Sequence, residues 1–145
     1  MSFTAKDVSV LRERTGCGMM DCKKALTESN GDMDKAIEVL RERGLAKAAK
    51  KAGRIAAEGL VLSVVNRSEK NGVIIEVNSE TDFVAKNEQF KEFIGLCADI
   101  ILKKKPSDVK ALLECVDSNG STVAQILQDK ILTIGENLVI RRFEI

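Results

Sequence analysis

The pattern of apolar residues changes abruptly in the middle of the chain, and this change sets the architecture of its larger part. Residues 60–65 and 73–77 are short runs rich in β-branched residues, separated by the segment 67–72 that ends in Asn-Gly. Two such runs with a turn between them predict a β-hairpin. Farther along, apolar residues recur at steps of three and four, which predicts one face of a helix. These residues are Phe90, Phe93, Ile94, Cys97 and Ile101.

The segment 79–87, Ser-Glu-Thr-Asp-Phe-Val-Ala-Lys-Asn, joins the predicted hairpin to this helix. Polar and acidic residues are favoured beside a helix N-terminus, so we expect Thr81 or Asp82 to cap the helix. Phe83 falls outside the apolar stripe, which leaves two interpretations. Either Phe83 packs on Asn87 or on the sheet as part of an ordinary helix start, or the rigid corner projects it toward a partner.

The composition is that of a globular protein that folds in water. Of 145 residues, 44% are hydrophobic and 31% are charged, and a net charge of +1 gives no overall basic field for nucleic acid. No apolar run is long enough to span a membrane, and the N-terminal sequence lacks the apolar core of a signal peptide. We therefore expect a cytoplasmic protein that has no membrane partner and binds no specific nucleic acid.

The residues that the sequence lacks argue against several kinds of catalytic and metal site. The chain has no histidine, and its cysteines, Cys17, Cys22, Cys97 and Cys115, form no C-x-x-C pair. We expect these cysteines to be reduced thiols. The glycine-rich motifs that cradle phosphates are also missing. We therefore predict no catalytic residue, no metal, no cofactor and no direct nucleotide binding, and we do not expect an enzyme.

Residues 1–44 are predicted to form a domain of three short helices, the third of which is expected to close at Gly44. Three short helices bury only a small core, so this domain is near the lower size limit for independent folding. Met19 and Met20 lie at the corner between the first two helices. Methionine at such a corner serves either as core filler or as an adaptable contact surface.

Residues 45–57 are predicted to be a basic, helical linker. The segment is rich in alanine, which favours a helix. It carries four basic and no acidic residues before Glu58, namely Lys47, Lys50, Lys51 and Arg54. Because no aromatic residue accompanies these charges, a solvated linker is favoured over a nucleic-acid site.

Residues 58–145 are predicted to form a larger domain with the element order β-β-α-α-α-β. Pro106 ends the long helix, Ser107 is expected to cap a shorter one, and residues 138–145 have the pattern of a strand. This order predicts an α+β fold, with a small antiparallel sheet and helices packed on one face. Because no polar tail follows the last strand, we expect a C-terminal continuation.

Two blocks of sequence resemble a known family. The first is Leu-Arg-Glu-Arg-Thr-Gly-Cys-Gly-Met-Met-Asp-Cys-Lys-Lys-Ala-Leu at 11–26, followed by Asn-Gly-Asp at 30–32 and the alanine-lysine stretch to Gly53. The second is Glu-Val-Asn at 76–78 with Glu-Thr-Asp-Phe-Val-Ala-Lys at 80–86, echoed by Ile-Gly-Glu-Asn at 134–137 and Arg-Arg at 141–142. In order and spacing these blocks resemble the elongation factor Ts family, the bacterial and organellar nucleotide-exchange factors for elongation factor Tu.

The resemblance implies a fold for each domain. The first would be a three-helix bundle similar to ubiquitin-associated (UBA) domains, and the second would be the first core subdomain of the family. Longer members continue into a second core subdomain, a helical dimerisation hairpin and a C-terminal module, which have no counterpart in this sequence.

The resemblance also implies a partner, elongation factor Tu in its GDP-bound and nucleotide-free forms. The corner residues would enter the nucleotide-binding domain of that partner and disturb its magnesium site, with Phe83 as a wedge. A second contact would come from the first domain. The residues implied to make these contacts are Thr81, Asp82, Phe83 and Val84 at the corner, and Met19 and Met20 in the first domain.

Two other functions remain as alternatives. A passive adaptor would use the three-helix domain to bind a helix or a ubiquitin-like surface, without any exchange activity. An RNA-binding protein would use the basic linker, but the chain has only five Phe and no Trp or Tyr on which bases could stack. The second domain distinguishes the adaptor from the exchange factor, because an adaptor has no use for an Asp-Phe corner on a rigid sheet.

Overall fold

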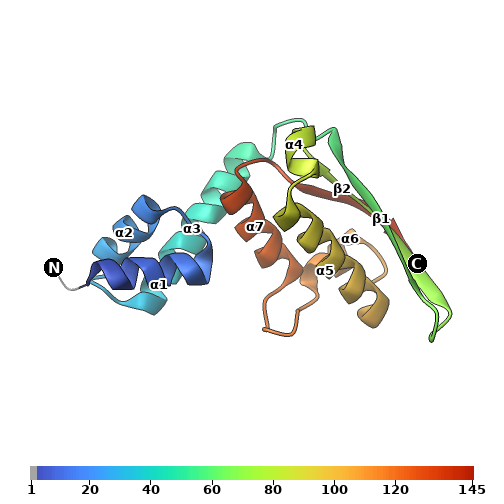
Figure 1. Ribbon diagram of the computed structural model, residues 1–145, viewed down its shortest axis with the longest axis horizontal. Helices are drawn as coiled ribbons and strands as arrows, with labels where there is room; N and C mark the ends of the chain where they lie inside the picture. The colour runs from blue at the N-terminus through green and yellow to red at the C-terminus, as the bar shows by residue number, and fades with distance from the viewer. Residues whose placement is uncertain (1–2) are drawn as a thin grey trace. The chain divides into compact units, whose positions relative to one another are not determined.

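A computed structural model describes residues 3–145, and the chain divides into two compact units at Ala52 and Gly53 (Figure 1). The division falls inside the segment 45–57 that the sequence predicts to be a linker. The first unit is helical, and the second combines helices with a three-stranded antiparallel sheet. The predicted α+β class is confirmed.

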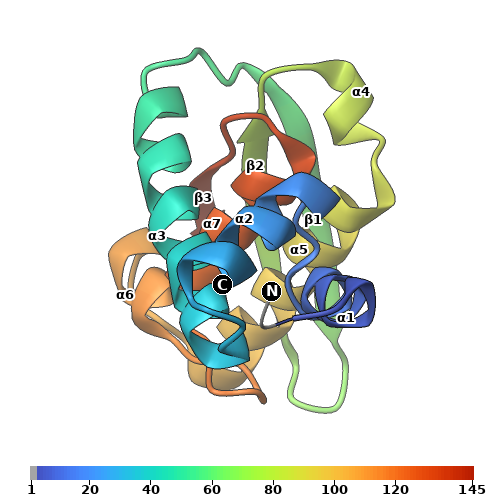
Figure 2. The same ribbon diagram turned by 90° about the vertical axis from the view of Figure 1, so that its left-hand side faces the viewer.

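The first unit is the predicted three-helix bundle, formed by α1 (Ala5–Thr15), α2 (Met19–Glu28) and α3 (Met33–Lys51) (Figure 2). Thr4 caps α1 through a capping box with Asp7, and Asp32 caps α3 by accepting a hydrogen bond from the backbone N–H of Lys35. The three helices share a small core. Its buried side chains include Val8, Leu11, Cys22, Ala25, Leu26, Ala36 and Leu40.

The third helix does not close at Gly44. Gly44 is a buried residue within α3, which continues to Lys51. A glycine inside a helix costs about 1 kcal/mol relative to alanine, and the strong helix formers that follow Gly44 offset this cost. Residues 45–51 of the predicted linker therefore form the C-terminal part of a helix that belongs to the first unit.

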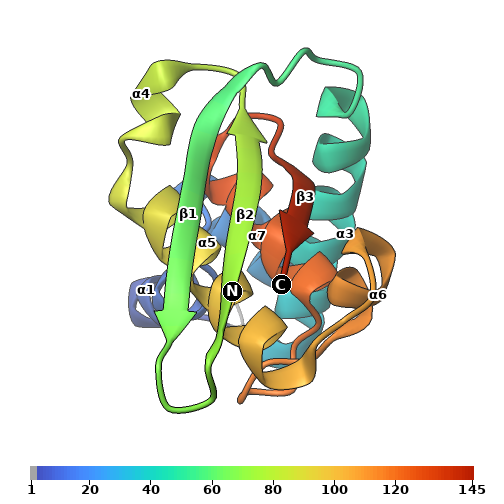
Figure 3. The same ribbon diagram turned by 90° about the vertical axis from the view of Figure 1, so that its right-hand side faces the viewer.

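The second unit is built on a sheet with the strand order β1-β2-β3, in which β1 (Glu58–Asn66) and β2 (Asn71–Ser79) form the predicted hairpin. β3 (Val139–Glu144) pairs with β2 in antiparallel fashion, with a register shift between Glu76 and Val77. Figure 3 shows β2 between the other two strands, with α5 and α7 behind the sheet.

The helices of this unit are α4 (Asp82–Ala85), α5 (Glu88–Lys104), α6 (Val109–Glu114) and α7 (Val123–Ile134). α5 packs against β1, β2 and α7, so the core lies between one face of the sheet and these helices. The apolar stripe predicted for the long helix is confirmed, because all five of its residues are at most 1% exposed. α5 contacts β2, whose buried side chains are Val73, Ile75 and Val77.

Three local expectations differ from the structure. The Asn71-Gly72 pair belongs to β2 rather than to the turn, and Lys70 takes the left-handed conformation with φ 55°. The short helix α6 is capped by Asp108 and not by Ser107, because Asp108 Oδ1 accepts the hydrogen bond from the backbone N–H of Ala111 at 2.7 Å. The predicted long helix is interrupted after Ala85, where Asn87 caps α5 separately.

The four cysteines are thiols and form no disulfide with one another, as predicted, and all four lie in the part of the chain that the structure describes. Cys17, Cys22 and Cys97 are buried, whereas Cys115 is partly exposed. Among residues 3–145, no helix is long and apolar enough to cross a membrane.

Candidate functional site

The candidate site is the corner between β2 and α5, which is formed by Glu80, Thr81 and the four-residue helix α4. Thr81 is the N-cap of α4, and its Oγ1 accepts a hydrogen bond from the backbone N–H of Val84 at 3.4 Å. Ser79 is fully buried at the end of β2, and its hydroxyl donates to the carbonyl oxygen of Thr81 at 2.9 Å. The local sequence thus ends the strand and starts the helix with its own side chains.

Neighbouring side chains of α4 face opposite environments. Val84 and Ala85 are buried, with 9% and 7% of their surfaces exposed, and they hold the helix against the sheet. Phe83 is 82% exposed, and Asp82 is exposed as well. Phe83 therefore does not pack on Asn87 or on the sheet, which removes the interpretation of Phe83 as a hydrophobic staple. An exposed Phe on a short, anchored helix is suited to contact with a partner.

Glu136, in the loop between α7 and β3, ties this corner to a distant part of the chain. Its Oε1 accepts hydrogen bonds from the backbone N–H groups of Glu80 and Thr81, at 3.2 and 3.0 Å. Its Oε2 accepts a hydrogen bond from Thr81 Oγ1 at 2.7 Å. One carboxylate thus satisfies two backbone donors and one side-chain donor, and charge-assisted bonds of this kind are stronger than neutral ones.

Glu80 makes the reciprocal connection. Its Oε1 accepts a hydrogen bond from the backbone N–H of Asn137 at 2.8 Å, and Arg54 Nη1 lies 3.5 Å from the same oxygen. Asn137 is itself 5% exposed, and its side-chain amide donates to the carbonyl oxygen of Arg54 at 2.9 Å. We refer to these contacts of Glu80, Glu136, Asn137 and Arg54 as the carboxylate clasp.

The sequence did not predict the clasp. Glu136 and Asn137 belong to the Ile-Gly-Glu-Asn block, so their presence in a recognisable motif was the available signal. Their partners lie between 55 and 83 residues away in the chain, beyond the reach of any periodic pattern.

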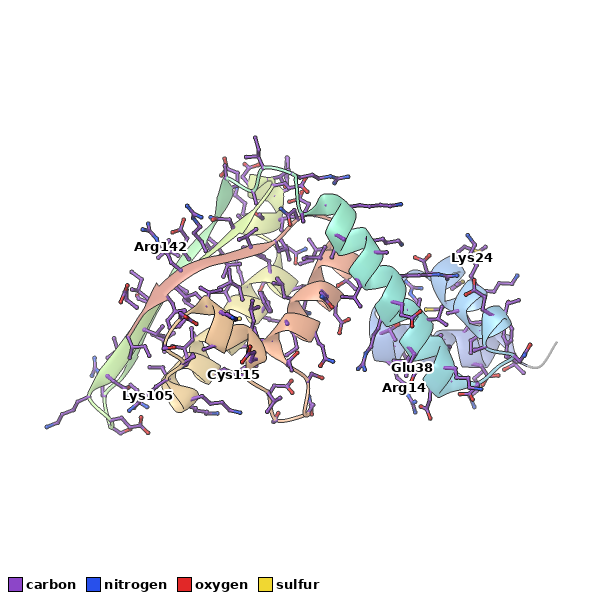
Figure 4. The ribbon with its side chains drawn as sticks, turned by 180° about the vertical axis from the view of Figure 1, so that it is seen from behind. Arg14, Lys24, Glu38, Lys105, Cys115 and Arg142 are labelled. Atoms are coloured by element: carbon purple, nitrogen blue, oxygen red, sulfur yellow. The ribbon has the colours of Figure 1, made fainter. Side chains whose placement is uncertain are left out.

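Another ion pair of the second unit joins two neighbouring strands, β2 and β3. Arg142 Nε donates to Glu76 Oε2 at 2.7 Å, and Figure 4 labels Arg142 on the outer side of the sheet. The hydrogen bond from Arg142, with a smaller contribution from Asn78, lowers the pKa of the Glu76 carboxyl. Glu76 is therefore a hydrogen-bonded carboxylate of the second unit that does not belong to the carboxylate clasp.

Met19 and Met20 begin α2 in the first unit, and they are 54% and 62% exposed. They are therefore surface residues and not core filler. Together with Phe3, Val8 and Lys23 they line a mostly apolar groove of about 430 Å³ between α1 and α2. A groove with flexible methionines at its rim can adapt to an apolar side chain of a partner.

Within the part of the chain that the structure describes, no group of three or more His, Cys, Asp or Glu residues is arranged to hold a metal ion. The carboxylates of Glu80 and Glu136 accept hydrogen bonds within the carboxylate clasp. On its exposed side the corner presents one large apolar side chain, Phe83, beside one acidic side chain, Asp82.

Comparison with known proteins shows which protein family this chain resembles. The family model "Elongation factor TS" matches residues 80–145, which include both the corner and Glu136. The chain is also 57% identical over 142 residues to "Elongation factor Ts" from three strains of Clostridium perfringens. This similarity covers 98% of the chain and 47% of each relative, so the chain spans about half the length of the curated relatives it matches.

Proposed function

Because the chain belongs to the elongation factor Ts family of translation elongation factors, we propose that it promotes the release of GDP from elongation factor Tu. The observation that carries this proposal is the 82% exposure of Phe83 on a helix whose other apolar side chains are buried. Phe83 is exposed to solvent, and the helix that carries it is anchored by its buried side chains. Its ring is therefore available to insert between helices or strands of a partner.

We propose that the segment 81–84 enters the nucleotide-binding domain of elongation factor Tu. Phe83 acts as the wedge, and Asp82 disturbs polar contacts near the magnesium ion that the partner holds. Magnesium requires near-ideal octahedral geometry, so a small displacement of its surroundings weakens GDP binding. Val84 contributes indirectly, because its buried side chain anchors the helix that carries Phe83.

The energetics require no covalent step. A protein that binds the nucleotide-free form of elongation factor Tu more tightly than the GDP form weakens GDP binding by the same ratio. Exchange of this kind needs no catalytic residue, no cofactor and no nucleotide site on the factor. We therefore propose a cytoplasmic binding protein and not an enzyme.

We propose that the groove beside Met19 and Met20 makes a second contact with elongation factor Tu. Its apolar lining and exposed methionines support this assignment. Two contacts that belong to one chain raise each other's effective concentration, so the first unit would contribute affinity while the corner performs the displacement.

The test is a release assay. Elongation factor Tu is loaded with fluorescent GDP and mixed with the chain and an excess of unlabelled GDP, and the loss of fluorescence is followed in a stopped-flow instrument. We expect release to accelerate with the concentration of the chain and then to saturate. Binding without any acceleration would contradict the proposal and would favour the alternative of a passive adaptor.

A further inference from the structure

We propose that Glu136 is a positioning residue that holds Phe83 in the orientation needed for exchange, an inference that rests on the proposed function of the corner. Glu136 does not lie next to Phe83 in sequence. It acts from the loop between α7 and β3 through the hydrogen bonds that it accepts from Glu80 and Thr81.

Glu136 orients the hydroxyl group of Thr81. The Thr81 hydroxyl donates to Glu136 Oε2 at 2.7 Å, and the hydroxyl oxygen accepts from the backbone N–H of Val84 at 3.4 Å. Because the carboxylate takes the only proton of this hydroxyl, a lone pair is left directed at the start of α4. Glu136 therefore fixes the rotamer of the cap that begins the helix.

The helix α4 is too short to hold its own orientation. This helix has only four residues, from Asp82 to Ala85, and a helix of this length has no stability of its own in water. Its orientation depends on the cap at Thr81 and on the burial of Val84 and Ala85. Loss of the cap would leave Phe83 on a turn that is anchored only by apolar packing.

A second hydrogen bond from the same loop strengthens the connection made by Glu136. Glu136 lies next to Asn137, whose backbone N–H donates to Glu80 Oε1 at 2.8 Å. The two carboxylates of the clasp thus connect the same two loops in both directions. A reciprocal connection resists rotation of one loop relative to the other better than a single hydrogen bond does.

A wedge that is already ordered loses less conformational entropy on binding, and a misplacement of about 1 Å is sufficient to slow a step by about 100-fold. We therefore expect Glu136→Ala to slow GDP release about 10- to 100-fold at saturating factor. Glu136→Gln keeps an oxygen that can accept from the two backbone N–H groups, but it replaces the acceptor of the Thr81 hydroxyl proton with an N–H₂ donor, so it should recover only part of the rate. If Glu136→Ala fails to fold, a wild-type release rate in Glu136→Gln would overturn the inference.

A matched control is Glu76→Ala, which removes another hydrogen-bonded carboxylate of the same unit but leaves the clasp intact. Its release rate should equal that of the wild type. The double variant Phe83→Ala/Glu136→Ala should lose much less rate than the product of the two single losses, because Glu136 acts through the helix that carries Phe83 and Asp82. Independent effects that multiply in the double variant would overturn the inference.

The stability of the carboxylate clasp is also tested without elongation factor Tu, by measuring the hydrogen-exchange rates of backbone amides in the free chain by NMR. In Glu136→Ala the backbone amides of Glu80 and Thr81 should exchange faster, whereas core amides of α5 should keep the wild-type rates. Unchanged exchange at Glu80 and Thr81 would overturn the inference, as would faster exchange there with normal GDP release. If Phe83→Ala itself releases GDP normally, the proposed function fails, and the positioning role for exchange fails with it.

Discussion

Phe83 and Val84 are consecutive residues of α4, yet Phe83 is 82% exposed and Val84 is 9% exposed. Within a single turn, α4 therefore carries one side chain that anchors it to the core and another that is available to a partner. Removal of the exposed ring should leave the core unchanged, whereas truncation of the buried valine would loosen the corner. Stability and partner contact are thus separable at this site.

Substitution of two glycines should have opposite effects on stability. Gly59 has φ +145°, and a Cβ there would lie 2.1 Å from the carbonyl oxygen of Val77, so Gly59→Ala should destabilise the hairpin by about 2 kcal/mol or more. A Cβ added at Gly95, within α5, would meet no packed neighbour within 4 Å, so Gly95→Ala should stabilise the protein by about 0.5–1 kcal/mol. Urea unfolding measures both changes. Equal effects of the two substitutions would show that backbone conformation does not decide them.

Stability should also fall at alkaline pH because of Cys97. Burial raises the pKa of its thiol from 9.0 to about 12, so the unfolded chain loses this proton first as the pH rises. The stabilising contribution is fully present below about pH 9 and is lost as the pH rises toward 12, by up to about 1.4 kcal/mol per pH unit. Urea unfolding of the wild type and of Cys97→Ala at several alkaline pH values measures the difference.

The Cys97→Ala comparison isolates this effect, because both proteins contain the same lysines and the same other thiols. The variant will be less stable at neutral pH, owing to the lost packing, but its stability should decline less steeply above pH 9. Parallel declines in the two proteins would show that the buried thiol makes no contribution to the pH dependence.

The exposed methionines should affect affinity and not the maximal rate. In a Met19→Ala/Met20→Ala variant, we expect the concentration of factor needed for half-maximal GDP release to rise about tenfold, as is usual for the loss of a good apolar contact. The rate at saturating factor should stay unchanged, and the free energy of unfolding should change by about 0.5 kcal/mol or less. A lower maximal rate would mean that the first unit takes part in the displacement itself.

Much of the fold was predictable because periodic burial leaves a direct record in the sequence. The stripe of Phe90, Phe93 and Ile94 predicted the buried face of α5, and the two β-branched runs predicted the hairpin. The ends of the helices and strands were harder to predict from the sequence. Whether the third helix ends at Gly44 depends on small differences in helix propensity between Gly44 and its neighbours. Whether Ser107 or Asp108 caps α6 depends on a similarly small difference in capping preference.

The site was predictable only in part, for a physical reason. Phe83 lies outside the apolar stripe of the long helix, which made contact with a partner one of its two interpretations. The structure shows that Phe83 is exposed, in agreement with that interpretation. The contact between Thr81 and Glu136 spans 55 residues and involves polar side chains, which follow no hydrophobic period. Tertiary folding alone brings such residues together, so a sequence can show that they are present but not that they meet.

The central claim is that Phe83 acts on elongation factor Tu and has no role in the core. The most direct measurement compares the wild type with Phe83→Ala in the release of fluorescent GDP at saturating factor, together with urea unfolding of each protein. We predict that release slows by at least about tenfold, while the free energy of unfolding changes by about 0.5 kcal/mol or less. A normal release rate would contradict the claim, as would a loss of about 3–5 kcal/mol in stability, the size expected for a buried residue such as Phe93.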